Sequence, residues 1–158
     1  MPRACAAPHA GALVSTPAHS PTGVDLYAGL IGSWSVDVTD YGDDGSVHRD
    51  TGEWHFSRIL DGRGVQDVWI SPPRSARGPS YAPGPFDRFG TSIRTPLAGG
   101  ETWKVIWLNP VRNVEVQLIG RRVGNHIRAD AFHWLGEIST DAGKTWSVEQ
   151  EMHLRRRR

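Results

Sequence analysis

The sequence predicts an all-β protein, an antiparallel β-barrel of about eight strands with a short N-terminal helix. Short runs that alternate apolar and polar residues recur from Ser33 onward, and this period of two is typical of half-buried strands. Tight-turn residues separate the runs, and no helical spacing lies between them. Seven tryptophans lie in or at the start of these runs and supply aromatic surface for an interior. Closing such a meander into a barrel removes its exposed edges.

The expected elements follow in order along the chain. Residues 24–31 form the one segment with helical spacing, which Asp25 can cap, and they are long enough to plug one end of a barrel. Glycine and aspartate mark turns at residues 42–45, 60–64 and 141–144. The expected strands are residues 33–39, 52–57, 65–70, 89–94, 102–108, 114–119, 132–138 and 146–154.

One domain, residues 25–158, carries this fold, and its composition, 38% hydrophobic and 22% charged, is ordinary for a globular chain. Residues 1–24 contain four prolines among Ala, Ser, His and Gly, and we expect a disordered leader there rather than a secretion signal. The single cysteine, Cys5, has no partner for an internal disulfide. This usage is typical of a cytoplasmic protein.

Charge and hydropathy argue against two classes of partner. The formal net charge is +1, with 18 basic and 17 acidic residues interspersed, so we expect no nucleic acid partner. The arginines at 155–158 are expected to form a solvated tail, the alternative being contact with phosphate or an acidic surface. No run approaches the roughly 20 apolar residues that cross a bilayer, so we expect no membrane association.

The longest expected loop spans residues 71–87. Its prolines and glycines do not pair in a sheet, and its length is typical of a lid. Tyr81 and Phe86 in this loop are expected to cover a bound ligand, the alternative being exposed loop residues.

Several segments resemble a known family. Gly32-Ser33-Trp34, which opens the first strand after a short helix, resembles the Gly-x-Trp start of the lipocalin-like or calycin superfamily, where the tryptophan closes one barrel end. The segments 52–54, 60–63, 66–69, 139–146 and 149–152 look like a mostly uncharacterised group of bacterial lipocalin-like domains. The resemblance implies a barrel with a central cavity. Some relatives of that fold are carriers, others haem proteins, and others cyclases or isomerases of specialised metabolism.

The chain departs from that pattern between residues 121 and 130, where such domains have another hairpin. Three interpretations stay open: a smaller barrel, a barrel open on one side, or a barrel completed by a second subunit in a homodimer.

Asp67 is the polar residue of most interest. It shares one strand face with Trp69, whereas Val68 shares the opposite face with Ile70, and the pattern does not decide which face is inside. A carboxylate desolvated by an aromatic pocket binds a proton more readily and can serve as a general acid or base. The alternative is a structural aspartate bonded to Arg63, to a backbone amide or to water.

The remaining candidates line the predicted interior. Gln150 is expected on the inner face of the last strand, where its amide can orient a ligand carbonyl or hydroxyl, or bond a neighbouring barrel residue. For any single tryptophan the alternative is a core position without ligand contact. The expected substrate-binding residues are Trp54, Trp69, Trp103, Trp107, Trp134, Trp146, Met152 and Tyr81.

We expect no metal ion and no other cofactor. The strand histidines share faces with acidic residues, a pattern typical of a solvated surface: His55 with Glu53, His133 with Glu137, and His153 with Glu149 and Glu151. A haem would need a histidine inside the cavity. His153 lies near the C-terminal end, as in some haem-binding barrels, but its parity is opposite to that of Met152.

Two functional hypotheses remain. The first is a cofactor-independent cyclase or isomerase of specialised metabolism, in which aromatic walls shape an apolar or aromatic substrate and Asp67, with Gln150, polarises it or moves one proton. The second is a carrier that binds an apolar small molecule without changing it. An inward, water-shielded Asp67 favours catalysis, whereas an outward-facing Asp67 with a wholly apolar interior favours the carrier. Nucleophile-elbow, phosphate-loop and dinucleotide motifs are absent from the sequence.

Overall fold

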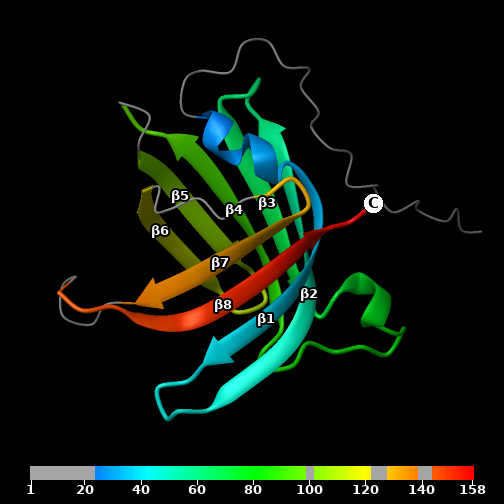
Figure 1. The fold of residues 1–158 in the computed structure, drawn as a ribbon. Coiled ribbons are helices and arrows are strands. Elements are labelled where there is room, and N and C mark those ends of the chain that lie inside the picture. The colour runs from blue at the N-terminus through cyan, green and yellow to red at the C-terminus, as the bar shows by residue number, and fades with distance from the viewer. Residues whose placement is uncertain (1–23, 99–101, 122–127, 139–143) are drawn as a thin grey trace, which may run out of the picture.

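The computed structural model describes residues 24–98, 102–121, 128–138 and 144–158, and these form one antiparallel eight-stranded sheet (Figure 1). The strand order is β6-β5-β4-β3-β2-β1-β8-β7. Each run of alternating residues in the sequence overlaps one strand, so the predicted all-β class and strand count are confirmed. The strands are β1 (Gly32–Tyr41), β2 (Val47–Ile59), β3 (Gly64–Ser71), β4 (Arg88–Pro96), β5 (Thr102–Asn109), β6 (Val114–Arg121), β7 (Ala131–Ile138) and β8 (Ser147–Arg156).

The sheet curls into a half-barrel. The ladder between β1 and β8, in which Val36 pairs with Leu154, joins the two ends of the chain. Within the described residues no ladder joins β6 to β7, so a fully closed barrel is not formed there. Of the three interpretations of the short segment after residue 121, the half-barrel fits the one that is open on one side.

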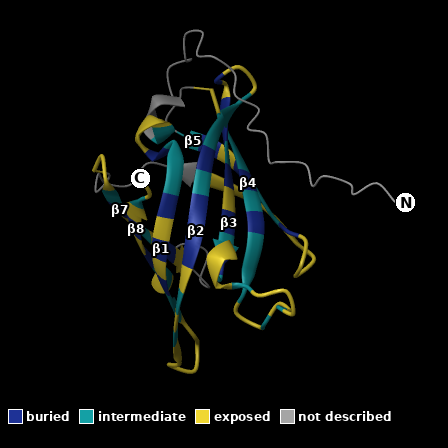
Figure 2. Cartoon of the chain, turned by 90° about the vertical axis from the view of Figure 1, so that its right-hand side faces the viewer, coloured by how far each residue is buried: buried dark blue, intermediate teal, exposed yellow. Residues whose placement is uncertain are grey.

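Alternating burial along the strands separates an inner from an outer face (Figure 2). On β3, Asp67 is 0% exposed and Trp69 is 4% exposed, whereas Val68 is 37% exposed. The ambiguity left by the sequence is therefore resolved, because Asp67 belongs to the inner face. The core continues through β1 and β8, where Trp34 and Leu154 are buried.

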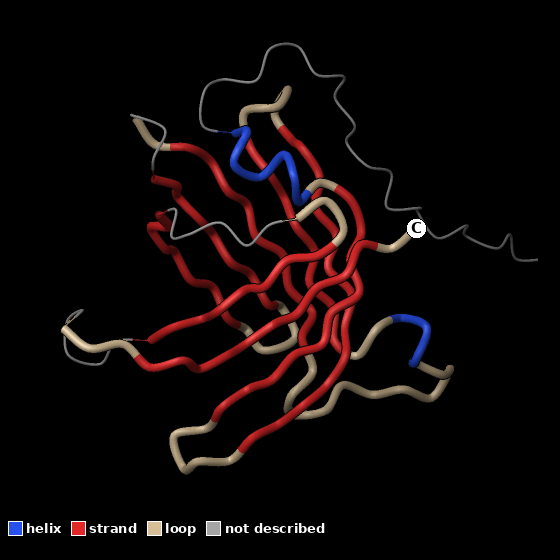
Figure 3. The backbone as a smooth tube through the Cα atoms, in the orientation of Figure 1, coloured by secondary structure: helices blue, strands red, loops and turns tan. Residues whose placement is uncertain are grey.

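The 3-10 helix η1 (Val24–Leu30) and the start of β1 lie at one end of the half-barrel (Figure 3). The indole nitrogen of Trp34 donates a hydrogen bond to the carbonyl oxygen of Leu30 at 2.7 Å. The guanidinium of Arg156 lies 4.1 Å from the centre of the Trp34 ring and donates to the carbonyls of Gly29 and Ile31. A cation over an indole and hydrogen bonds to free carbonyls hold η1 against the barrel end.

The loop between β3 and β4 is attached to the outer face. Its short 3-10 helix η2 (Arg74–Ala76) places the Nε of Arg74 2.6 Å from Oε1 of Glu53, and Nη1 of Arg157 lies 2.6 Å from Oε2. Burial alone raises the pKa of Glu53, but hydrogen bonds from Arg74 and Arg157 and the attraction of Arg74 outweigh it and lower the pKa to about 2. Glu53 therefore links the loop and the C-terminal end to β2.

A β-bulge changes the parity of β8. Gly136 pairs with Gln150 but the next residue, Glu137, pairs with Val148, so Glu149 is an extra residue on β8. Beyond the bulge the inner and outer positions exchange. Trp146 is consequently 59% exposed, which corrects the prediction that it lies on the inner face.

Residues 1–23 of the leader expected at 1–24, and residues 141–143 of the turn expected at 141–144, lie outside the described residues. In the part of the chain that the structure describes, no helix has the length and apolar character needed to cross a membrane.

Candidate functional site

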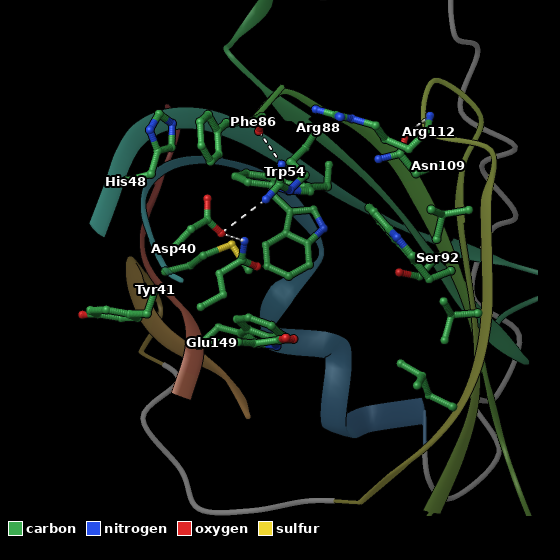
Figure 4. A pocket seen from close by; sticks show the side chains of 18 of the residues that line it. Asp40, Tyr41, His48, Trp54, Phe86, Arg88, Ser92, Asn109, Arg112 and Glu149 are labelled. Carbon is green, nitrogen blue, oxygen red and sulfur yellow. Dashed lines mark hydrogen bonds and ion pairs between the residues drawn. The ribbon is translucent and has the colours of Figure 1, made fainter. Parts of the chain in front are cut away.

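A cavity of about 720 Å³ lies in the curl of the sheet (Figure 4). Aromatic and aliphatic side chains form its wall, and polar side chains gather at the end of β1 that points away from η1. The lining residues are Asp40, Tyr41, Gly42, Ser46, His48, Trp54, Trp69, Phe86, Arg88, Ser92, Arg94, Val105, Trp107, Asn109, Arg112, Val114, Val116, Leu118, Trp134, Glu149, Gln150 and Met152.

The apolar wall of the cavity contains five of the residues that the sequence assigned to ligand binding, four tryptophans and one methionine. The rings of Trp54 and Trp69 lie 5.6 Å apart, and those of Trp54 and Trp134 lie 6.2 Å apart and nearly perpendicular, at 78°. These are the separations at which aromatic rings attract each other, so the indoles support one another in the wall. The five are Trp54, Trp69, Trp107, Trp134 and Met152.

Glycines on the strands next to the tryptophans give the indoles room to lie against the sheet. A methyl group at Gly52 would come within 2.7 Å of the Trp69 ring, and one at Gly90 would overlap the Trp107 ring. Cβ atoms do not approach ring carbons this closely. The glycines therefore let the ring systems lie close to the backbone, which keeps the cavity open.

Three other predicted ligand-binding residues lie outside this cavity. Trp103 is 1% exposed and packs edge-on against Tyr27, with ring centres 4.7 Å apart, so it belongs to the core beneath η1. Trp146 lies before the β8 bulge, where the parity is inverted, and its side chain is exposed. The hydroxyl of Tyr81 donates to Asp87 within the loop. Core packing keeps Trp103 out of the cavity, the parity change at the bulge does so for Trp146, and the bond to Asp87 does so for Tyr81.

Asp67 lies behind the cavity wall. Its carboxylate forms an ion pair with Arg94, accepts a hydrogen bond from the indole nitrogen of Trp54 at 2.7 Å, and lies 3.4 Å from the hydroxyl of Ser92. Arg94, Trp54 and Ser92 line the cavity, but Asp67 does not. The partner considered from the sequence, Arg63, instead lies 3.7 Å from Asp61 on the surface. Asp67 thus holds three wall residues in place.

Arg94 is a mostly buried cation in the lining of the cavity. Its side chain is 12% exposed, and its guanidinium carbon lies 5.5 Å from the ring centre of Tyr27 and 5.8 Å from that of Phe56. Burial lowers the pKa of Arg94. A cation with a buried carboxylate on one side and aromatic rings on others is well fixed in position.

The polar end of the cavity is organised around Asp40 (Figure 4). Its Oδ1 accepts a hydrogen bond from the side-chain nitrogen of Gln150 at 2.5 Å and lies 3.4 Å from Nη2 of Arg88. Gln150, a residue predicted from the sequence to act on a ligand, therefore lies in the cavity as expected but is bonded to Asp40 rather than placed beside Asp67. Glu149, the bulge residue, adds a second carboxylate to this end.

The end of the 71–87 loop reaches the same end of the cavity. The rings of Phe86 and His48 stack with centres 3.9 Å apart and planes at 15°. Nη2 of Arg112 donates to the carbonyl oxygens of Gly84, at 2.8 Å, and of Pro85. Phe86 is thus the aromatic residue of the loop that reaches the cavity.

Sequence reasoning missed the charged lining residues. Asp40 continues the inner face of Trp34, Val36 and Val38. Arg94 lies two residues after the buried Ser92 on β4 and therefore shares its face. That parity was the available signal. A charged residue in an alternating run is taken to mark the end of the strand when its ionic partner is distant in the sequence. Arg94 is such a residue, because its partner Asp67 lies on another strand.

The histidines occupy different places. His48 lines the cavity with its ring against Phe86. His153, the residue considered for haem, is 59% exposed on the opposite face of the sheet. Its position on the outer face agrees with the parity argument from the sequence.

The fold and the cavity define a class: an antiparallel half-barrel with an aromatic pocket and a charged rim. A scan against protein-family models finds no match to the chain, and a search of curated proteins finds no significant match. The similarity to lipocalin-like domains therefore stays a prediction from the residues that suggest it.

Proposed function

We propose that the protein is a small-molecule-binding protein that takes an apolar or aromatic ligand into the half-barrel. The observation that carries the proposal is the cavity of about 720 Å³ with four tryptophan side chains in its wall. Pockets of this size and character bind drug-sized molecules through their apolar walls and use a few polar groups for orientation.

The charged rim supports a ligand with one polar end. Arg88, Gln150 and Asp40 form a connected group at one end of the cavity, and Arg112 lies beside it. A ligand whose apolar part faces Trp54 and whose polar part reaches this group would bury its rings and still have a hydrogen-bond partner for its polar atoms.

Ligand binding can be tested by native mass spectrometry of protein purified gently from its source, followed by titration with the fluorescent aromatic anion anilinonaphthalene sulfonate. Val116→Trp places an indole in the cavity. Val68→Trp makes the same change on the outer face of β3, and the two valines are 38% and 37% exposed. We expect Val116→Trp to weaken probe binding at least about tenfold, or 1.4 kcal/mol, with Val68→Trp unchanged. Equal binding by wild type and both variants would contradict the proposal.

Asp40 favours a second candidate, the cofactor-independent cyclase or isomerase. Its carboxylate is on the cavity wall with a side-chain exposure of 19%, and Gln150 holds it from one side. A carboxylate at the surface of an apolar pocket can accept a proton from one carbon or hydroxyl of a substrate and return it to another. In this scheme Asp67, which does not line the cavity, positions Arg94 and Trp54 rather than touching the substrate.

The two candidates differ in what the cavity does to its ligand. A molecule released unaltered, near one per chain, supports binding alone. A product isomeric with a co-occurring precursor supports catalysis, and Asp40→Asn should then abolish conversion of that precursor while keeping its binding within a few-fold. Conversion that persists in Asp40→Asn would rule out this role for Asp40.

A further inference from the structure

We propose that the outer face of the β7–β8 hairpin is a binding site for a divalent transition-metal ion, with His133, Glu151 and His153 as its ligands. His133 on β7 and His153 on β8 are direct cross-strand partners. Glu151 precedes His153 by two residues on β8, so its side chain shares their face. This site is separate from the cavity, whose lining contains none of the three.

The ligating atoms already converge. Nε2 of His133 lies 2.8 Å from Oε1 of Glu151, and Nε2 of His153 lies 3.2 Å from the same oxygen. The ligand atoms of all three residues lie within 4.8 Å of one another. Ligands bonded to a tetrahedral zinc ion at about 2.0–2.2 Å are roughly 3.3 Å apart, so small side-chain rotations suffice to bind an ion.

The two imidazoles are ordered as a pair. Their rings are stacked, with centres 4.4 Å apart and planes at 2°. Neighbouring strands fix the spacing of the two backbones, so only the rings have to turn for both nitrogens to face one ion. This reduces the entropic cost of binding at an exposed surface.

Tyr41 on β1 orients the carboxylate. Its hydroxyl donates to Oε2 of Glu151 at 3.0 Å, which leaves Oε1 toward the imidazoles. A hydrogen bond from a neighbouring residue to a ligating carboxylate is a regular part of metal sites.

The donor set indicates the class of ion. Two imidazoles and one carboxylate suit zinc, copper or nickel rather than magnesium or calcium, which prefer oxygen alone. The side chains of His133, Glu151 and His153 are 33%, 27% and 59% exposed, so an ion can enter and water can complete its coordination. Asp37 on β1, the cross-strand partner of His153, adds a further acidic residue at this face.

The sequence did not indicate a metal site, because alternation shows only which residues of one strand share a face and not which residues of two strands are neighbours. His133 and Glu151 are 18 residues apart, and only the register of β7 against β8 brings them together. Since β7 is the last strand of the sheet, an ion shared by both strands would fasten the sheet edge at the open side of the half-barrel.

The test is isothermal titration of the full chain with ZnCl₂ in a buffer that does not bind zinc. We expect His133→Ala and His153→Ala each to weaken binding of one equivalent at least about tenfold, and Tyr41→Phe to weaken it less. His55→Ala is the matched control. His55 also faces a glutamate oxygen, of Glu53 at 3.3 Å, but it has no imidazole as its cross-strand partner on β1 or β3, so this variant should bind zinc as wild type does.

A second measurement keeps the test independent of folding. Zinc should raise the Tm of wild type and of His55→Ala but not of the double variant His133→Ala/His153→Ala, whose circular dichroism should match wild type without metal. Co²⁺ in the wild-type site should give the intense visible absorption of a four-coordinate ion. The proposal is overturned if wild type shows no zinc binding, or if the double variant binds zinc with the affinity of wild type.

Discussion

The buried pair of Asp67 and Arg94 should be one of the most sensitive points of the fold. Asp67 is 0% exposed and the side chain of Arg94 is 12% exposed, so solvent screens neither charge well. In Asp67→Asn the amide oxygen can still accept the hydrogen bond from Trp54, and the main loss is the negative charge opposite the guanidinium. An uncompensated charge at such a depth costs about 3–5 kcal/mol, a large fraction of the 5–15 kcal/mol that stabilises a typical domain.

Urea unfolding followed by tryptophan fluorescence measures this cost. The control is Asp61→Asn, which breaks an Asp–Arg pair whose side chains are 76% and 67% exposed, and it should change the free energy of unfolding by less than about 1 kcal/mol. The double variant Asp67→Leu/Arg94→Met removes both charges and should recover most of the loss. A loss below about 1 kcal/mol in Asp67→Asn, or a double variant as unstable as the single ones, would refute the reasoning.

Three further results are expected. Because the pKa of Glu53 is about 2 in the fold, against about 4.3 in an unfolded chain, its contribution is present above pH 4.3 and is lost as the pH falls toward 2. Glu53→Gln should therefore lower the free energy of unfolding at pH 7 by up to about 3 kcal/mol and flatten its decline in acid, measured by urea unfolding at several pH values; parallel pH curves would contradict this. Gly90→Ala should push the Trp107 ring toward the cavity, reduce stability by about 1–3 kcal/mol and weaken binding of the fluorescent probe, and unchanged binding would contradict the packing argument. Trp146→Ala removes a side chain that is 59% exposed and should change stability by less than about 0.5 kcal/mol and leave probe binding unaltered; a tenfold loss of binding would place Trp146 at the ligand after all.

Local pattern was enough to predict the strands. Alternation over short runs depends only on which residues avoid water, and every predicted run overlaps an observed strand. The same alternation correctly placed Trp54, Trp107 and Trp134 on the inner face. It failed for Trp146, because a single extra residue opposite Gly136 inverts parity and leaves no mark in the hydrophobic pattern.

The chemistry of the site depended on contacts between distant strands. From the sequence alone Asp67 could face either way, and its partner Arg94 lies on the next strand across the loop of residues 71–87. Gln150 was expected in the interior, but its bond to Asp40 joins residues 110 positions apart. The pairing of His133 with His153 likewise exists only in the register of β7 and β8.

The sequence by itself determined the fold class, the number of strands and most of the aromatic wall, because each of these follows from burial along a few consecutive residues. Only the tertiary structure decided which charges meet, which tryptophans face the cavity, and that the described sheet stays open between β6 and β7. The reason is physical: hydrophobic burial acts on each residue separately, whereas an ion pair, a hydrogen bond or a metal site requires two or more side chains at a distance of a few ångströms.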